Sequence, residues 1–375
     1  MKKFLAGTTA LVAAAVVAGQ AQAADPIKLS LGGFAEAWVG YADQDEVGGD
    51  DFANVLVQQD TEVYFRGSTK LDNGLTIGVN IDMEADSNAT TQDDVFVSVS
   101  SDALGTLKIG STKGASYGLS HTAPDVGIGH NDGDVQNWIQ DQSQTANNGG
   151  NNTNPGFDND TLTSSADGQK VVYLTPNIAG FQAGASYGII PESVSSTVNV
   201  GSTNTGSDIQ YNVGVAYNGE FGGVSIGADV NYELIDNGGT NGTSVNNEAL
   251  GRAGLSIGVA GFTIGGSWFA ANNVGAVSSK DADGWDLGVS YETGPYGVSV
   301  SYMSLSQDDK TAGSTANVQE DEKDTWMVSG SYDLGAGVAL KGSIFGADFD
   351  DASSTGTTAN DNDGYGVVAG LAVSF

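Results

Sequence analysis

The chain has 375 residues, of which 46 are acidic and 13 basic, so its formal net charge at pH 7 is −33. Such a charge repels nucleic acid, and we expect no nucleic-acid partner. The sequence contains no cysteine, which excludes a fold built on disulfides. Glycine occurs 55 times, without a collagen period. Since glycine suits strand positions where curvature or close packing leaves no room for a side chain, the composition favours one large β domain.

Residues 1–23 are predicted to be a cleaved signal peptide, leaving 24–375 as the folded domain. Lys2 and Lys3 precede an apolar stretch, and Ala21-Gln22-Ala23 closes it with a small residue on each side of the glutamine. The apolar stretch is too short to span about 30 Å of hydrocarbon. No later segment approaches the roughly 20 consecutive apolar residues of a spanning helix, so we expect none.

After the signal peptide the sequence predicts sixteen strands, each recognised by a two-residue alternation of apolar and polar side chains. In chain order they are 27–41, 55–70, 75–86, 92–101, 106–113, 169–176, 181–188, 207–218, 224–234, 248–259, 262–271, 283–293, 297–307, 323–333, 337–348 and 362–375. Tight connections rich in Gly, Asn, Asp and Pro, such as 71–74 and 293–297, alternate with longer polar connections. All the turns are therefore expected at one end of the sheet and all the long loops at the other.

Outward aromatic residues recur at matching heights on three strands that run in the same direction. The pairs, each six residues apart, are Tyr211/Tyr217, Trp285/Tyr291 and Trp326/Tyr332. Six residues cover roughly 20 Å of strand, which after tilting matches the separation of aromatic belts at two membrane interfaces. A soluble β-sandwich, the alternative, buries its apolar face and has no need of such belts. The pattern favours a 16-stranded antiparallel transmembrane β-barrel around a water-filled lumen.

The last strand alternates in the same way and ends on an aromatic residue, Phe375. With the segments TEVYFRGSTKLDNGLTIG (61–78), FVSVSSDALGTLKIGS (96–111) and VVYLTPNIAGFQAGASYG (171–188), the chain resembles the Gram-negative general diffusion porins of alphaproteobacterial type. The resemblance implies a homotrimer in the outer membrane, in contact with lipid and lipopolysaccharide, that passes ions and small hydrophilic solutes passively. It implies short periplasmic turns, long external loops and periplasmic termini. It also makes Phe375 part of the signal that the barrel assembly machinery reads.

The third long connection, 114–168, is by far the longest, and loops of this length in a compact fold are usually functional. In the porins the third loop folds into the pore and narrows it, and APDVGIG (123–129) resembles part of that loop. By position, Asp125, Asp132 and Asp134 become candidate carboxylates of the constriction. The alternative is that they are ordinary solvated loop acids.

The predicted inner wall departs from the family, in which many members line one side of the constriction with several arginines. The candidate wall residues are Glu62, Arg66, Lys70, Asp82, Lys108 and Arg252, with Lys170 and Lys341 as further basic positions. Inward acids are more numerous and include Asp60, Glu84, Asp94, Asp229, Glu233 and Asp286. A transverse field from Arg66 and Arg252 to the loop acids would rest on few cations. We therefore expect a moderate preference for cations.

Other classes of function have little support in the sequence. Both histidines, His121 and His130, fall in the long loop, and no predicted strand contains one, so we expect neither an enzyme nor a cofactor. Metal binding by His121, Asp125 and His130 is a weak alternative, because loop residues of this kind are usually solvated. Acidic external loops, with Asp43, Asp45, Asp50 and Asp51, can gather loosely bound Ca²⁺. The alternative function is a barrel that acts mainly as a surface adhesin or scaffold through its loops.

Overall fold

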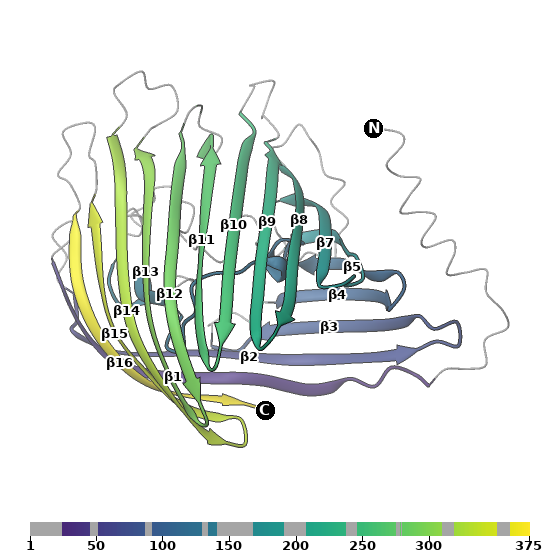
Figure 1. Cartoon of the computed structure of the whole chain (residues 1–375), viewed down its shortest axis with the longest axis horizontal. Coiled ribbons are helices and arrows are strands. Elements are labelled where there is room, and N and C mark those ends of the chain that lie inside the picture. Colours follow the sequence, from purple (N-terminus) through teal and green to yellow (C-terminus); the bar gives the residue numbers. More distant parts are fainter. Residues whose placement is uncertain are drawn as a thin grey trace.

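The structure, a computed structural model, describes residues 25–45, 52–86, 92–129, 134–140, 168–190, 208–237, 246–274, 278, 280–309, 319–350 and 361–375. The signal peptide lies outside these residues and stays a prediction. The described strands form one closed antiparallel barrel (Figure 1). Within the same residues, no helix is long and apolar enough to cross a membrane.

All sixteen predicted strands are confirmed, with ends that differ by a few residues. They are β1 (Ser30–Gln44), β2 (Val55–Lys70), β3 (Thr76–Glu84), β4 (Gln92–Ser101), β5 (Gly105–Thr112), β6 (Gly168–Leu174), β7 (Phe181–Ile190), β8 (Asp208–Phe221), β9 (Val224–Asp236), β10 (Glu248–Val259), β11 (Phe262–Asn272), β12 (Ala282–Thr293), β13 (Tyr296–Asp309), β14 (Gln319–Gly335), β15 (Val338–Asp350) and β16 (Asn362–Ser374). Two short 3₁₀ helices, η1 (Tyr117–Leu119) and η2 (Asp134–Asn137), lie in the third long connection.

Each strand pairs with its neighbours in sequence, and β1 pairs with β16 to close the barrel. In Figure 1 the short turns from β8 to β15 lie at the bottom of the barrel, and those between β2 and β3 and between β4 and β5 lie at its right. In the two-residue turns 260–261 and 336–337 both residues have positive φ, from 51° to 85°, as type I′ hairpins require. Phe375 extends the closing seam by exchanging two backbone hydrogen bonds with Gly33, of 2.9 and 3.0 Å. Closure leaves the sheet without a free edge.

The outer surface of the barrel is apolar and carries aromatic contacts at two heights. Val57 is 75% exposed and Trp285 42%, values that only an apolar surrounding medium explains for so many strands. Near the loop end, ring pairs include Tyr187–Tyr211 at 5.5 Å and Trp285–Tyr302 at 5.3 Å between centroids. Near the turn end they include Phe181–Tyr217, Phe262–Tyr291 and Tyr296–Tyr332. These two belts fit the two interfaces of a bilayer, and the soluble sandwich is wrong.

The inside of the barrel is not polar throughout, which differs from the alternation expected of a plain aqueous lumen. An apolar cluster lies inside, built from β1, β14, β15, β16 and the third connection. Its members are Trp38, Ala42, Ile128, Val135, Trp138, Ile139, Met327, Phe345, Ala347, Phe349 and Val368. Part of the lumen is therefore packed like a protein core, because the inner face of these strands offers apolar side chains for the loop to cover.

Candidate pore constriction

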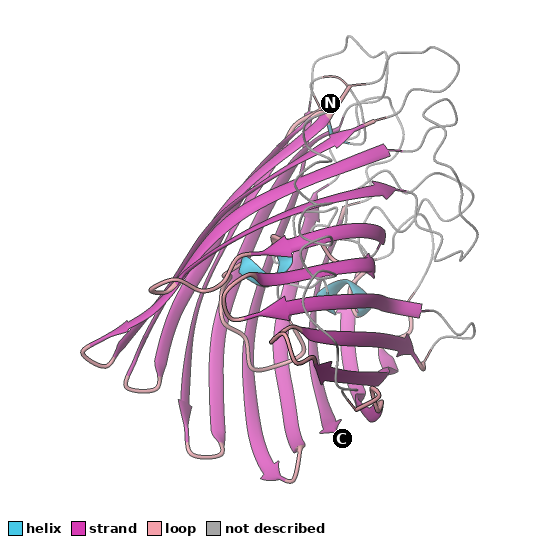
Figure 2. Ribbon diagram, turned by 90° about the vertical axis from the view of Figure 1, so that its right-hand side faces the viewer, coloured by secondary structure: helices cyan, strands magenta, loops and turns pink. Residues whose placement is uncertain are grey.

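The third connection runs along the inner wall of the barrel, and its short helices lie at mid-height (Figure 2). Its backbone N–H groups donate in sequence to side chains of successive strands. The pairs are Ser116 to Asn212 Oδ1 on β8 (2.8 Å), His121 to Asp229 Oδ1 on β9 (2.7 Å), Ala123 to Asp286 Oδ1 on β12 (3.2 Å), Val126 to Ser299 Oγ on β13 (3.1 Å), Ile128 to Ser343 Oγ on β15 (3.3 Å) and Gln140 to Gln44 Oε1 on β1 (2.7 Å). We call this side of the barrel, from β8 to β15 and on to β1, the covered wall.

These acceptors stand on the opposite face of their strands from the exposed apolar residues. Asp229, for example, is buried, whereas the next residue, Val230, is 61% exposed. Because neighbouring strand residues point to opposite sides, the loop lies inside the barrel. The fold expected from the sequence, with a long third loop in the pore, is confirmed for residues 113–129 and 134–140.

Asp125 is a structural residue of the loop as well as a candidate for the constriction. Its carboxylate accepts hydrogen bonds from the backbone N–H of Gly127 (3.0 Å) and Gly129 (2.9 Å), and from Ser299 Oγ on β13 (3.0 Å). The side chain is half-buried. Asp125 therefore shapes the loop and ties it to the wall. Asp132 lies outside the described residues, and of Asp134 the structure describes the backbone at the start of η2.

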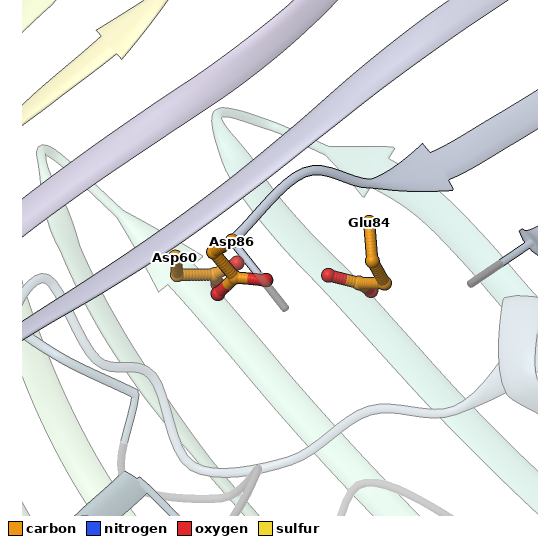
Figure 3. Close-up of side chains that lie close together, drawn as sticks. All are labelled: Asp60, Glu84 and Asp86. Carbon is orange, nitrogen blue, oxygen red and sulfur yellow. The ribbon is translucent and has the colours of Figure 1, made fainter. Parts of the chain in front are cut away.

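Carboxylates gather on the side of the lumen formed by β2, β3 and β4. Oxygens of Asp60, Glu84 and Asp86 lie within 4.8 Å of one another (Figure 3), and so do those of Glu62, Glu84 and Asp93. Lys113, at the start of the third connection, interacts electrostatically with Glu84. We call these five acidic residues the acidic wall. So many carboxylates with so few basic neighbours create a field that attracts cations.

The sequence alternation predicts Asp94 on the inner face and does not predict Asp93 there. The pairing of β3 with β4 shifts between Ile81 and Met83, so that Ile81 faces Val95 and Met83 faces Gln92. This β-bulge places one extra residue on β4 and brings the Asp93 carboxylate to Glu62 and Glu84. A bulge changes the phase of a strand without leaving a clear mark in the sequence.

Three basic residues of the inner wall form ion pairs with acids on the strands. Arg66 forms an ion pair with Asp82 and lies 3.9 Å from the ring centroid of Tyr64, and Lys341 Nζ is 3.0 Å from Glu36 Oε1. Arg252 is buried and donates to Asp229 Oδ2 at 3.2 Å. The sequence predicts a transverse field between these two arginines and the acids of the loop. In the structure Arg66 and Arg252 pair with acids on the strands instead.

The other basic candidates differ in their surroundings. Lys108 lies 4.8 Å from the ring centroid of Phe96, and Lys70 is exposed at the end of β2, near the turn. Lys170 is buried on β6. Asp43 and Asp45 lie at the loop end of β1, and Asp43 accepts a 3.0 Å hydrogen bond from the Tyr365 hydroxyl. Asp50, Asp51 and His130 lie outside the described residues. The idea of loosely bound Ca²⁺ therefore stays a prediction.

A cavity of about 390 Å³ separates the loop tip from the acidic wall. Its lining includes Asp60 and Asp86 on one side and Ile128 and Trp138 of the loop on the other. The Trp138 ring packs over Gly40 of β1, where an added Cβ would come within 2.3 Å of it. The loop thus packs on β1 through Trp138 and also accepts a hydrogen bond from Gln58 of β2 at the Asn137 carbonyl, and the remaining space is lined in part by carboxylates.

The family model of the Gram-negative porins matches residues 7–352. A comparison with curated proteins found no match. Among solved structures, the anion-selective porin from Comamonas acidovorans has a TM-score of 0.60 at 18% identity, over 93% of this chain and all of that chain. A loop-deletion mutant of the outer membrane protein OmpT of Vibrio cholerae has a TM-score of 0.60 at 13% identity, over 94% of this chain and all of that chain. A trimer form of OmpT has a TM-score of 0.59 at 11% identity, over 94% of this chain and all of that chain. At such identities these structures support the fold alone.

Proposed function

Because this chain belongs to the Gram-negative porin family, we propose that it is a passive diffusion channel that favours cations. Family and fold together make it an outer-membrane porin. The proposal concerns what the channel passes: ions and small hydrophilic solutes that move down their own gradients through a water-filled lumen. We infer that it does so without catalysing a reaction.

The observation that carries the cation preference is the acidic wall. Five carboxylates line one side of the lumen, while Arg66 and Lys341 are offset by two further acids, Asp82 and Glu36. A lumen of this kind raises the local concentration of cations above that of the bulk solution. The field is screened beyond about 10 Å at 0.1 M salt, so the preference is moderate and strongest in dilute electrolyte.

The test is the reversal potential of the purified channel in a planar bilayer under a dilute KCl gradient. We expect a potential whose sign reports K⁺ in excess of Cl⁻. A potential of the opposite sign overturns the cation preference while leaving the channel intact. A protein that inserts but carries no current overturns the channel itself, and favours the alternative of an adhesin or scaffold.

A homotrimer is the second part of the proposal. The trimer form of OmpT is a structural neighbour, and the outer faces of β1 and β16 carry small residues, such as Ala35 and Ala369, between larger ones. Small side chains let barrels approach closely, whereas the aromatic belts of the other strands suit lipid. We expect an oligomer that resists SDS at room temperature and falls to about one third of its mass on boiling. A monomeric mass by light scattering in mild detergent contradicts this.

A further inference from the structure

His121 is held in the barrel more completely than its neighbours in the loop. Its backbone N–H donates to Asp229 Oδ1 at 2.7 Å, and its carbonyl oxygen accepts from Arg252 Nη2 at 2.8 Å. Its ring spans two strands, with Nδ1 3.2 Å from Asp229 Oδ1 on β9 and Nε2 2.9 Å from Asn218 Oδ1 on β8. One residue thus connects the loop to three adjacent strands.

The wall is shaped to receive this residue. A Cβ added to Gly227 on β9 would come within 2.4 Å of His121 Nε2. One added to Gly254 on β10 would come within 2.1 Å of the His121 carbonyl oxygen. Such distances are far below van der Waals contact, so any side chain at these positions displaces the loop. The two glycines and the side chains of Asn218, Asp229 and Arg252 together form the binding site of this one loop residue.

We propose that His121 is the positioning residue of the constriction loop, and that it holds the loop most tightly to the covered wall as an imidazolium, a hold that loosens when the ring loses a proton. The inference rests on the proposed channel function. Both ring nitrogens face oxygen acceptors, and only the doubly protonated ring can donate from both. A neutral ring donates from one nitrogen only, and the second contact is then kept only when the Asn218 amide turns its Nδ2 towards the ring.

The charged groups that face His121 decide its protonation. The carboxylate of Asp229 is the main cause of a pKa above the ordinary value, and the Asn218 oxygen acts in the same direction. Partial burial and the positive charge of Arg252 oppose them. Asp286 on β12 accepts from Ala123, two residues along the loop. The contribution of the ring is therefore complete below about pH 6.5 and is lost as pH rises through the higher pKa of the folded protein, whereas the backbone hydrogen bonds of His121 to Asp229 and Arg252 remain.

Release has a local effect because other anchors stand on both sides. Ser116 is bound to Asn212, and Ala123 to Asp286. A neutral His121 keeps its backbone bonds to Asp229 and Arg252 but loses a ring contact, so the few residues between these two points move more in the lumen. We expect a smaller and noisier current at high pH, with the barrel itself unchanged.

The experiment follows single-channel current in a bilayer from pH 5.5 to pH 9 in concentrated KCl, where surface charge matters least. We expect the noise to rise and the mean conductance to fall with a midpoint above about pH 6.5. In His121→Gln this transition disappears. The matched control is His130→Gln, which removes the other histidine of the same loop and keeps the transition. Asn218→Asp adds a negative partner and moves the midpoint up by on the order of one pH unit.

A second measurement reports the loop without relying on conduction. The chain has no cysteine, so Ser120→Cys places a single spin label next to His121. Its mobility should increase with pH in the otherwise native chain and be independent of pH when His121→Gln is added. A label whose mobility is the same at pH 5.5 and pH 9, or a transition that survives in His121→Gln, overturns the inference. The proposed cation preference does not depend on this result, because the reversal potential tests it independently.

Discussion

The two sides of the inner wall are built from the same kind of strand, but their acidic residues have different roles. On the covered wall, polar side chains such as Asp229 and Asp286 accept hydrogen bonds from the loop, and the apolar cluster around Trp138 packs against it. On the acidic wall, carboxylates such as Asp60 and Glu84 crowd together beside a cavity. An acid on one wall is a structural anchor, and an acid on the other is part of the field in the lumen.

The difference shows that counting inward charges does not by itself predict selectivity. Asp229 is buried and shared between Arg252, His121 and Asn231, so its charge is largely offset where it stands. The oxygens of the acidic wall are held close together by the pairing of β2 with β3 and β3 with β4. Position relative to the loop therefore matters more than the number of acids.

The largest expected effect comes from removing the apolar support of the covered wall. Trp138→Ala deletes a buried ring from the cluster around Phe345 and Val368. Truncations of this kind cost about 3–5 kcal/mol in a packed core. We expect the loop tip to detach and the current to become noisy. The control is Trp268→Ala on the outer surface, where the ring is half exposed. A quiet, native-like current in Trp138→Ala contradicts the packing argument.

Deletion of Phe375 acts at the seam next to the covered wall. It removes the two backbone hydrogen bonds with Gly33 and the aromatic end of β16. We expect fewer barrels in the outer membrane, and normal conductance for those that insert, because the residue lies at the rim and not in the lumen. The measurement is the yield from outer-membrane fractions followed by bilayer recording. Equal yields for the two proteins would refute an assembly role.

Salt concentration should act on the acidic wall and leave the covered wall alone. Between about 0.1 M and 1 M salt the screening length falls from roughly 10 Å to 3 Å. We expect the cation preference to decrease strongly over this range, while current noise stays constant because buried contacts are poorly screened. Reversal potentials at a fixed KCl ratio and increasing total salt measure it. A preference that does not change with salt points to a narrow steric filter in place of a diffuse field.

Arg66→Gln should have the smallest effect. The substitution frees Asp82 from its ion pair and removes one positive charge beside Tyr64. We expect the cation preference to increase by a factor of about two or less, because the pair is partly solvated and screened. Lys70→Gln is the matched control, since it removes a positive charge near the turn end of the same strand. If Lys70→Gln has the larger effect, the field acts at the pore mouth.

The strands could be predicted from sequence because their signal is local. Each two-residue alternation, and each turn such as 260–261, is decided by residues close in the chain, and closure follows once the strands are counted. The path of the loop could not be predicted in this way, because the residues that anchor it lie far from it in the sequence. Ile128 meets Ser343 across 215 positions of sequence, and nothing near either residue marks the other. The bulge that moves Asp93 inward, and the anchoring role of Asp125, depend on the same long-range geometry.

The most direct test of the acidic wall compares two triple variants in one reversal-potential experiment. The wall variant carries Asp60→Asn, Glu62→Gln and Glu84→Gln, and the loop variant carries Asp125→Asn, Asp132→Asn and Asp134→Asn. Each variant replaces three carboxyl groups by amides, and in Asp125→Asn the new side chain keeps an oxygen that can accept from Gly127 or Gly129. We predict that the wall variant loses most of the cation preference in dilute KCl and that the loop variant keeps most of it. The reverse order would show that the loop carboxylates, and not the acidic wall, set the ion preference of this pore.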